Sequence, residues 1–402
     1  MNRRAFLAAL GSSLATAGCT FSFADGLWNR CDAGPLSGPA RQLVASALAG
    51  VAFGDAWDAH CHVFGNGDSG SGLWVNPALE KIWPLAGYVR RKFYVNASCM
   101  REDPGSVDAS VVERLVAQCE AMPEGFRALL FAFDWARDEA GRPDRERSTF
   151  HVPDAYCATL AQRHPRHFAW ASSIHPYDPA ALDRLDAAVA RGARAVKWLP
   201  TAQGIDPASP RCDRFYDRLA AKRIPLITHG GDEHAVHGFA EALGNPLRLR
   251  RPLDRGVRVV VAHCASLGAG EDLDRGGSRP NFELFARLMD EPRYATLLHG
   301  DVSSVVQGNR LDVVTTLLAR RDWHPRLLNG SDYQLSGILP LVSLSDLADR
   351  GLVDRRAVAP LSELRNSNVL LFDFVLKRSL GNNGAGFARS VFETRPFFEA
   401  SA

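Results

Sequence analysis

Two histidines end a short apolar run, Ala56–His62. The run reads Ala-Trp-Asp-Ala-His-Cys-His, so His60 and His62 are two residues apart. Residues i and i+2 of a strand point to the same face, so a strand here would project both imidazoles together and turn Cys61 away. Two imidazoles on one face can bind one divalent metal. The pair alone is weak evidence, because His-x-His also occurs in ordinary surface loops.

Metal-competent side chains recur at the ends of later apolar runs. His229 ends one run, His263 ends the next, and Asp332 follows the last. Lys197 lies inside a fourth run, where a buried amine needs a charged partner. Histidine and aspartate suit Zn²⁺, Mn²⁺ or Fe²⁺. These residues together predict a metal site, provided that the fold brings the ends of the runs to one place.

Eight apolar runs alternate with helical patterns along the chain. The runs are Ala56–His62, Arg127–Phe133, Phe168–His175, Arg194–Leu199, Pro225–His229, Val257–His263, Ala295–Val302 and Arg326–Gly330. Helical patterns cover Asp154–Arg163, Pro179–Arg191, Arg211–Ala221, Phe282–Asp290, Arg310–Arg320 and Leu361–Leu380. Near-continuous apolar runs indicate parallel strands buried on both faces. Eight strand–helix units predict an α/β fold, a (β/α)₈ TIM barrel. An open doubly wound sheet is the alternative, although no Gly-x-Gly-x-x-Gly follows any run.

Catalytic residues of such barrels lie at the carboxyl ends of the strands, where these candidates fall. The connection after the first strand is unusually long and contains the aromatic segment Leu73–Tyr94. It is expected to form either a pocket wall or lid, or an insertion that packs on the barrel rim.

The ordered set resembles the amidohydrolase superfamily of metal-dependent hydrolases over most of residues 55–375. Shorter phrases resemble its amidohydrolase-related branch: Val152-Pro-Asp-Ala-Tyr156, His164-Pro165, Ser173-Ile-His-Pro176, Gly330-Ser-Asp332 and Arg365-Asn-Ser-Asn368. The order and spacing carry the resemblance, since each phrase alone is weak.

The resemblance implies a role for each candidate. His60, His62 and Asp332 would bind the more buried metal. His229 and His263 would bind a second metal, or one of them would complete a single site. The implied cofactor is one or two divalent ions, most often Zn²⁺.

Lys197 decides between one ion and two. In two-metal members a lysine on the fourth strand is carboxylated and bridges the ions, which would favour two here. The alternative is a structural lysine whose stem packs at the strand end while its amine reaches water.

The implied activity is hydrolysis of an amide, ester or lactone of a small molecule. A metal lowers the pKa of bound water towards ~7. Asp332 would accept a proton from the water and pass it to the leaving group, with assistance from His263. The alternative is a non-oxidative decarboxylase with one metal, acting on an aromatic or unsaturated carboxylic acid. A lipid-tethered binding protein that has kept the barrel is the third hypothesis.

Five other polar or aromatic residues at or near the strand ends are weaker site candidates: Asp134, Trp135, His175, His299 and Asp301.

The N-terminus predicts export. Asn2-Arg-Arg-Ala-Phe-Leu7 resembles a twin-arginine signal and precedes a short Ala/Leu-rich stretch. Thr16-Ala-Gly-Cys19 resembles a lipobox, so Cys19 is expected to carry a lipid. We therefore expect a signal peptide at 1–18, a tether at 19–50, the barrel at 51–380 and a tail at 381–402. The expected location is the periplasm or cell surface, with membrane contact only through Cys19.

The net charge and the cysteine count argue against a nucleic-acid-binding protein and against a disulfide framework. The 402 residues carry a formal net charge of +2, which gives no basic excess for nucleic acid. Of eight cysteines, seven remain after Cys19, and no Cys-x-x-Cys pair is present. That odd number argues against a disulfide framework.

Overall fold

Parallel strands form the centre of the molecule. The computed structural model describes residues 22–31, 34–79, 81, 85–103, 105, 107–236, 240–381 and 386–399. The predicted signal peptide and Cys19 lie outside these ranges. All eight apolar runs contain a strand. These strands are β1 Trp57–His62, β3 Arg127–Phe131, β5 Phe168–Ala171, β6 Val196–Trp198, β7 Leu226–His229, β8 Val259–Ala262, β11 Leu298–Asp301 and β12 Leu327–Leu328.

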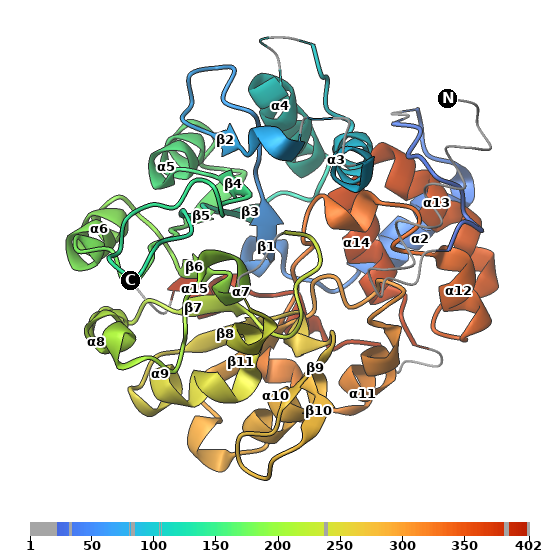
Figure 1. The fold of residues 1–402 in the computed structure, drawn as a ribbon. Coiled ribbons are helices and arrows are strands. Elements are labelled where there is room, and N and C mark those ends of the chain that lie inside the picture. The colour runs from blue at the N-terminus through green and yellow to red at the C-terminus, as the bar shows by residue number, and fades with distance from the viewer. Residues whose placement is uncertain are drawn as a thin grey trace.

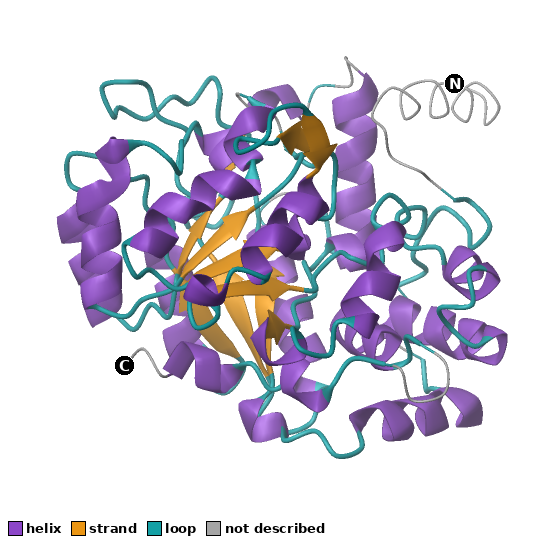
Figure 2. Cartoon of the chain, turned by 90° about the horizontal axis from the view of Figure 1, so that it is seen from below, coloured by secondary structure: helices purple, strands orange, loops and turns teal. Residues whose placement is uncertain are grey.

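Figure 1 shows β1, β3, β5, β6, β7, β8 and β11 following one another in chain order, and Figure 2 shows the strands gathered at the centre with helices around them. Two parallel sheets have the orders β1-β3-β5 and β6-β7-β8-β11-β12. A single parallel bridge, Ser172 to Val196, joins β5 to β6, and a second, Cys61 to Tyr333, joins β1 to the segment after β12. The predicted (β/α)₈ class is therefore confirmed, with single bridges in place of continuous ladders at two seams.

Helices surround the strands (Figure 1). Their bounds are α2 Gly38–Leu48, α3 Leu85–Ser98, α4 Val107–Glu120, α5 Asp154–Arg163, α6 Ala181–Ala190, α7 Pro200–Gln203, α8 Asp213–Ala221, α9 Arg250–Asp254, α10 Asn281–Met289, α11 Val314–Ala319, α12 Leu344–Asp349, α13 Val358–Ser367, α14 Val369–Arg378 and α15 Arg395–Glu399. The helix predicted at Leu361–Leu380 is two helices, because Asn368 is extended and its side chain caps α14 by accepting from Leu371 N. None of the described helices has the length and apolar character needed to cross a membrane.

Small and branched apolar side chains fill the inside of the barrel. Alternate strand residues contribute to this inner cluster: Trp57, Ala59, Leu129, Phe131, Ala169, Ala171, Ala195, Ile227, Val260 and Leu328. Phe398 of α15 is fully buried in the same cluster and stacks on Trp57, with ring centroids 6.0 Å apart. The structure thus differs from the predicted C-terminal tail: residues 386–399 close the barrel end opposite the predicted site, because two aromatic rings at that end need burial.

The long connection after β1 forms a separate wall. It contains α3, α4 and the short strand β2 Trp74–Val75, which pairs with β4 Phe150–His151. An antiparallel hairpin, β9 Ala269–Glu271 with β10 Ser278–Pro280, follows β8. Val89 and Phe93 of α3 pack with Ala97 and Ile338 in a small core of their own.

The segment predicted as a tether packs on the body of the protein. Ala40 and Ala47 of α2 are buried, and α2 contacts α13 and α14. Before α2, Cys31 forms a disulfide with Cys99, which follows α3. The sequence argued against a disulfide framework, and this one bond is the exception to it: the other described cysteines, Cys61, Cys119, Cys157, Cys212 and Cys264, are buried thiols. The number and spacing of cysteines do not reveal that positions 31 and 99 meet in the fold.

Candidate metal centre

An irregularity in β1 aims the two histidines into the barrel. The register between β1 and β3 shifts between Asp58 and Cys61. Ala59 accordingly faces the inside of the barrel, whereas Cys61 faces the outer core. A bulge reverses the alternation of side chains along a strand. His60 and His62 therefore both line the cavity above the barrel.

Three further strands place polar residues above the inner apolar layer. Lys197 follows inward-facing Ala195, and His229 follows inward-facing Ile227, each by two residues. Asp301 ends β11 and is fully buried. Alternation along each strand thus turns these side chains inward at the carboxyl end of the barrel.

His263 and Asp332 lie just after their strands in a strained conformation. Their φ angles are +55° and +52°. Non-glycine residues with positive φ are uncommon and concentrate at functional sites. Asp332 N donates to His60 O at 2.8 Å, and Ser331 N donates to the Asp58 carboxylate at 2.7 Å. The backbone of β1 therefore positions the carboxylate that follows β12.

The three donor atoms of His60, His62 and Asp332 converge. His60 Nε2 is 3.3 Å from His62 Nε2, and Asp332 Oδ1 is 3.4 Å and 3.1 Å from these two atoms. An ion ~2.1 Å from each ligand separates neighbouring ligand atoms by about 3.0 Å in octahedral and about 3.4 Å in tetrahedral geometry. The observed separations fit a divalent metal of either geometry.

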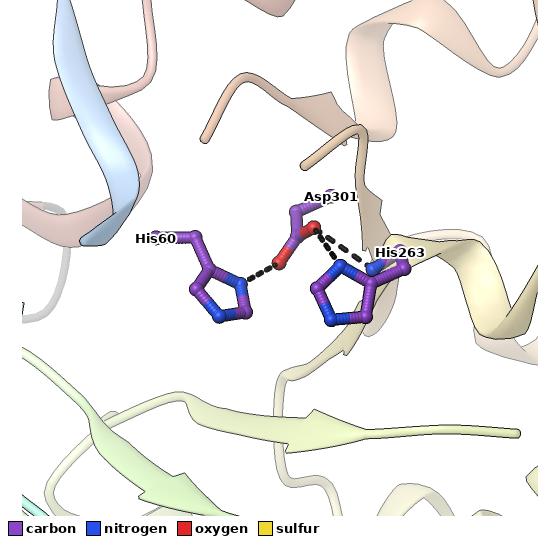
Figure 3. A group of neighbouring side chains, drawn as sticks. All are labelled: His60, His263 and Asp301. Carbon is purple, nitrogen blue, oxygen red and sulfur yellow. Dashed lines mark hydrogen bonds and ion pairs between the residues drawn. The ribbon is translucent and has the colours of Figure 1, made fainter. Parts of the chain in front are cut away.

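Asp301 lies behind His60 and fixes its tautomer. The Nδ1–H of His60 donates to Asp301 Oδ2 at 2.8 Å, while His263 N donates to Asp301 Oδ1 at 2.9 Å (Figure 3). With its Nδ1 proton committed, His60 turns the lone pair of Nε2 towards His62 and Asp332. A buried carboxylate in this position orients a metal-binding histidine.

His263 is held in the same way. Its Nδ1–H donates to Ser303 O at 3.1 Å, and the hydroxyl of Ser303 lies 2.8 Å from Nδ1. The Nε2 lone pair then faces Asp332 Oδ2 at 3.8 Å. Ser304 Oγ donates to Asp332 Oδ2 at 2.6 Å and leaves Oδ1 directed at His60 and His62.

Burial and charge put each group in the state that a metal needs. Burial, together with the charge of Lys197, lowers the pKa of His60 to about 4, and burial lowers the pKa of His263 well below its usual range. Burial opposes ionisation of Asp332, but His60 and the hydrogen bond with His62 outweigh it and hold its pKa well below the usual range. Near pH 7 the imidazoles of His60 and His263 are therefore neutral and the carboxylate of Asp332 is ionised.

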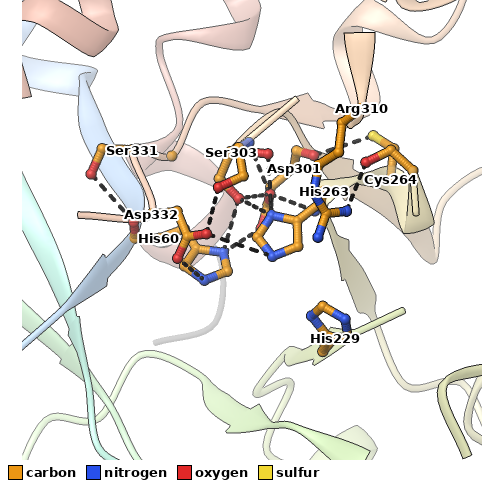
Figure 4. Close-up of polar contacts among 12 residues, drawn as sticks. His60, His229, His263, Cys264, Asp301, Ser303, Arg310, Ser331 and Asp332 are labelled. Carbon is orange, nitrogen blue, oxygen red and sulfur yellow. Dashed lines mark hydrogen bonds and ion pairs between the residues drawn. The ribbon is translucent and has the colours of Figure 1, made fainter. Parts of the chain in front are cut away.

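Lys197 and His229 line the cavity beside this centre. Lys197 Nζ lies 3.4 Å from His60 Nε2 and 4.9 Å from the centre of the Phe131 ring. The Nε2–H of His229 donates to Asp232 O at 3.1 Å, and its Nδ1 faces Glu233 Oε2 at 3.4 Å. His229 lies apart from the linked cluster in Figure 4, with its ring centre 5.3 Å from that of His263.

A cavity of about 320 Å³ opens over the centre. Its polar lining includes Arg310, Gln307 and Gln334, and aromatic and aliphatic residues of α3 and of the segment after β12 form much of its wall. A cavity of this size accommodates a small molecule.

Several weaker candidates have structural roles. Asp134 forms ion pairs with Arg184 and Arg137, and His175 accepts from Tyr177 N while it donates to Gln203 O. His299 packs on Phe397 at the closed end of the barrel. Sequence reasoning missed Ser303 and Ser304, although their place directly after β11 was a usable signal.

Comparisons with known proteins agree with this architecture. A family model described as amidohydrolase matches residues 57–300, a span that begins with β1, ends within β11 and stops before Asp301 and Asp332. No curated protein has significant similarity to the chain.

Several solved structures are similar to the chain. An uncharacterized TIM-barrel protein from Bordetella bronchiseptica is 15% identical over 76% of this chain and 94% of its own, with a TM-score of 0.48. A putative 2-pyrone-4,6-dicarboxylic acid hydrolase from Pseudomonas putida is 18% identical over 79% and 97%, with a TM-score of 0.44. A 5-carboxyvanillate decarboxylase from Novosphingobium aromaticivorans, in complex with manganese, is 13% identical over 86% and 96%, with a TM-score of 0.45.

Proposed function

The chain belongs to the amidohydrolase family, and we propose that it is a metal-dependent hydrolase that cleaves an amide, ester or lactone bond of a small molecule. The observation that carries this proposal is the convergence of His60, His62 and Asp332 beneath a cavity. Zn²⁺ is the proposed ion. When bound, a divalent metal polarises a carbonyl group and lets water deliver hydroxide near neutral pH.

Asp332 is the proposed general base and general acid. Its ionised carboxylate lines the cavity and can accept a proton from the attacking water, then return it to the leaving group. The hydrogen bond from Ser304 keeps the carboxylate from rotating. His263, with its Nε2 lone pair towards Asp332, is the second proposed proton acceptor and a candidate ligand.

Lys197 bears on the number of ions. Burial lowers its pKa to about 8, against the opposing charges of Asp301 and Asp332, so a fraction of the amine is neutral near pH 7 and can react with CO₂. Carboxylation of Lys197 would add an anionic ligand between the His60 side and the His229 side. We propose two ions when this lysine is carboxylated and one when it is not.

A one-metal decarboxylase is the second candidate. It is favoured by one observation. Of the two groups of potential ligands among the described residues, only His60, His62 and Asp332 all line the cavity, while His229 is committed to Asp232 and Glu233. Such an enzyme would release CO₂ from a carboxylic acid held over the same centre.

Turnover of defined probes separates the two reactions. The Zn²⁺-loaded protein is expected to hydrolyse p-nitrophenyl acetate, dihydrocoumarin or p-nitroacetanilide and to lose this activity after chelation. CO₂ release from 4-hydroxybenzoate without hydrolysis of the three probes would favour the decarboxylase. Metal analysis of the wild type and Lys197→Ala adds the stoichiometry: a drop from two ions to one supports the bridging lysine, and one ion in both excludes it.

We also propose export and lipid anchoring at Cys19. The sequence pattern at residues 1–19 supports this, and a disulfide such as Cys31–Cys99 is typical of proteins in oxidising compartments. In cells, Cys19→Ser should move the protein from the membrane fraction to the soluble fraction. Sedimentation of the variant with membranes would contradict the anchor.

A further inference from the structure

A fully buried lysine contacts the segment that carries Asp332. Lys377 and Asp373 are one turn apart on α14, and the Lys377 ammonium donates to Asp373 Oδ2 at 2.6 Å. Their side chains are 0% and 1% exposed. Lys377 Nζ also donates to Gly330 O at 2.5 Å. A helix outside the sheet thus holds the backbone two residues before Asp332.

The peptide group between Gly330 and Ser331 is held at both of its polar atoms. Its carbonyl oxygen accepts from Lys377, and its N–H donates to the Asp58 carboxylate of β1. The carbonyl and the N–H of a trans peptide point in opposite directions, so Lys377 acts from the side opposite Asp58. Because the peptide group is planar, one hydrogen bond on each side fixes its orientation. The next residue is Asp332, so this orientation sets the direction in which the chain enters the metal centre.

The same segment has little room to move towards β1. A Cβ on Gly330 would lie 2.5 Å from His60 Cβ and 2.8 Å from His60 N, so the segment packs closely on the strand. Asp332 follows with a φ of +52°. A strained conformation of this kind persists only where the surroundings fix it. Lys377 supplies a contact that β1 cannot supply, on the other side of the segment.

Stability alone does not account for the ion pair of Lys377 and Asp373. The attraction between two buried charges repays the cost of removing them from water only if the geometry is excellent and their remaining hydrogen bonds are made. Asp373 Oδ1 has no hydrogen-bond partner among the described residues. Neither side chain is among the described residues that line the cavity, so the pair does not serve as a ligand contact there. The contact with Gly330 explains why an ammonium group is buried at this place.

We propose that Lys377 is a positioning residue of the metal centre. Through the Gly330 carbonyl it fixes the peptide group before Asp332, and so aims the Asp332 carboxylate at the two histidines of β1. Asp373 keeps the Lys377 side chain in the orientation that reaches Gly330. This inference rests on the proposed metal-dependent function and adds to it a residue from outside the barrel strands.

Metal affinity tests the inference without turnover. Lys377→Met keeps most of the length of the side chain and removes the ammonium group. Its Kd for Zn²⁺, measured in competition with a chelator, should be about 10-fold or more above the wild-type value. The visible absorption spectrum of the Co²⁺-loaded variant should also change, because one ligand is displaced. For a hydrolysed ester, kcat should fall by about 10-fold with KM little changed.

A double variant separates positioning from folding. Lys377→Met with Asp373→Asn leaves no unpaired buried charge, so Tm should stay within about 5 °C of the wild-type value while the loss of metal affinity remains. Arg365→Met is the control, because Arg365 is also fully buried and donates to a backbone carbonyl outside the segment of Asp332, Val342 O at 2.6 Å. This control should lower Tm and leave the Kd for Zn²⁺ unchanged.

Several results would overturn the role of Lys377. They are wild-type affinity with an unchanged Co²⁺ spectrum in the double variant, or an equal loss of affinity in Arg365→Met. Failure of both Lys377 variants to fold would overturn it too, because the ion pair would then serve the fold itself. A wild type that binds no Zn²⁺ would refute the metal centre together with this inference. If no ester is hydrolysed by any variant, the proposed hydrolysis fails, whereas the ratio of the metal affinities still decides the role of Lys377.

Discussion

The floor and the wall of the cavity are built in different ways. The floor is made of strand ends, where His60, Lys197 and Asp301 each extend from a hydrogen-bonded sheet. The part of the wall that faces the centre is made of α3 and the short 3₁₀ helix η10, Leu335–Gly337, which belong to no sheet. A side chain on the floor is therefore fixed by the barrel itself, whereas α3 depends on contacts with its neighbours. Chemistry needs the rigid support, and selectivity can sit on an element that varies independently.

The N-terminal segment, residues 22–31, fastens the wall. Its Cys31 is joined to Cys99, and Asn29 N donates to Asn96 Oδ1 at 2.7 Å while Asn96 Nδ2 donates to Asn29 O at 2.9 Å. Trp28 stacks on Phe93, with ring centroids 5.0 Å apart. On the other side, Arg90 and Tyr94 each donate to Ala235 O at 3.2 Å. We therefore expect substitutions in the floor and in the wall to have separate effects, the first on activity and the second on the stability of α3.

Substitution on the floor should abolish chemistry and leave the fold intact. Asp332→Asn removes the proton acceptor and one metal ligand, so kcat/KM for a hydrolysed probe should fall by roughly 10³-fold or more. Circular dichroism and Tm should change little. Asp312→Asn is the control, because its side chain is 93% exposed. Kinetics like those of the wild type in Asp332→Asn would refute the assigned role.

Removal of the disulfide that fastens the wall should have the opposite effect: it should lower stability and leave the metal centre unchanged. The double variant Cys31→Ser, Cys99→Ser opens a loop of sequence separation 68 and should lower the free energy of unfolding by about 4 kcal/mol. Hydrogen exchange in α3 should accelerate while β1 stays protected, and the metal content should not change. Unaltered exchange in α3 would show that the disulfide does not hold the wall.

Burial of Lys197 should make the stability of the protein depend on pH. Burial lowers its pKa from 10.5 to about 8. Below pH 8, Lys197 is protonated in both the folded protein and the unfolded chain. Between pH 8 and 10.5 the folded protein has lost a proton that the unfolded chain keeps. The free energy of unfolding therefore rises with pH in this range. The rise should total about 3 kcal/mol. Chemical denaturation of the metal-free protein should show it in the wild type and not in Lys197→Met; parallel profiles would contradict the shift.

The smallest effect is expected at the stack between Trp28 and Phe93. Trp28→Ala removes one ring pair from a half-exposed position and should cost about 1 kcal/mol, with faster exchange in α3. For a small probe that contacts only the residues at the strand ends, kcat/KM of the variant should stay within a factor of about two of the wild-type value. A loss as large as that of the disulfide variant would mean that stacking, and not the covalent link, fastens the wall.

The sequence predicted the floor better than the wall. His60, His62, His263 and Asp332 stand at the ends of apolar runs, and a barrel brings such ends together, so spacing alone carried the information. Asp301 could be predicted for the same reason. The bulge in β1 could not be predicted, because it depends on pairing with β3 rather than on local sequence.

The wall depends on contacts between distant residues, which periodicity does not show. Cys31 meets Cys99 across 68 residues, and the predicted tether and C-terminal tail both pack because aromatic and aliphatic side chains found partners far away in the sequence.

Anomalous scattering from crystals grown with Zn²⁺ or Mn²⁺ tests the central claim most directly. A peak is predicted about 2.0–2.3 Å from His60 Nε2, His62 Nε2 and Asp332 Oδ1. The peak should vanish in His62→Asn and persist in the Cys31→Ser, Cys99→Ser variant. No peak, or a peak that survives loss of His62, would contradict a metal centre at the ends of the strands.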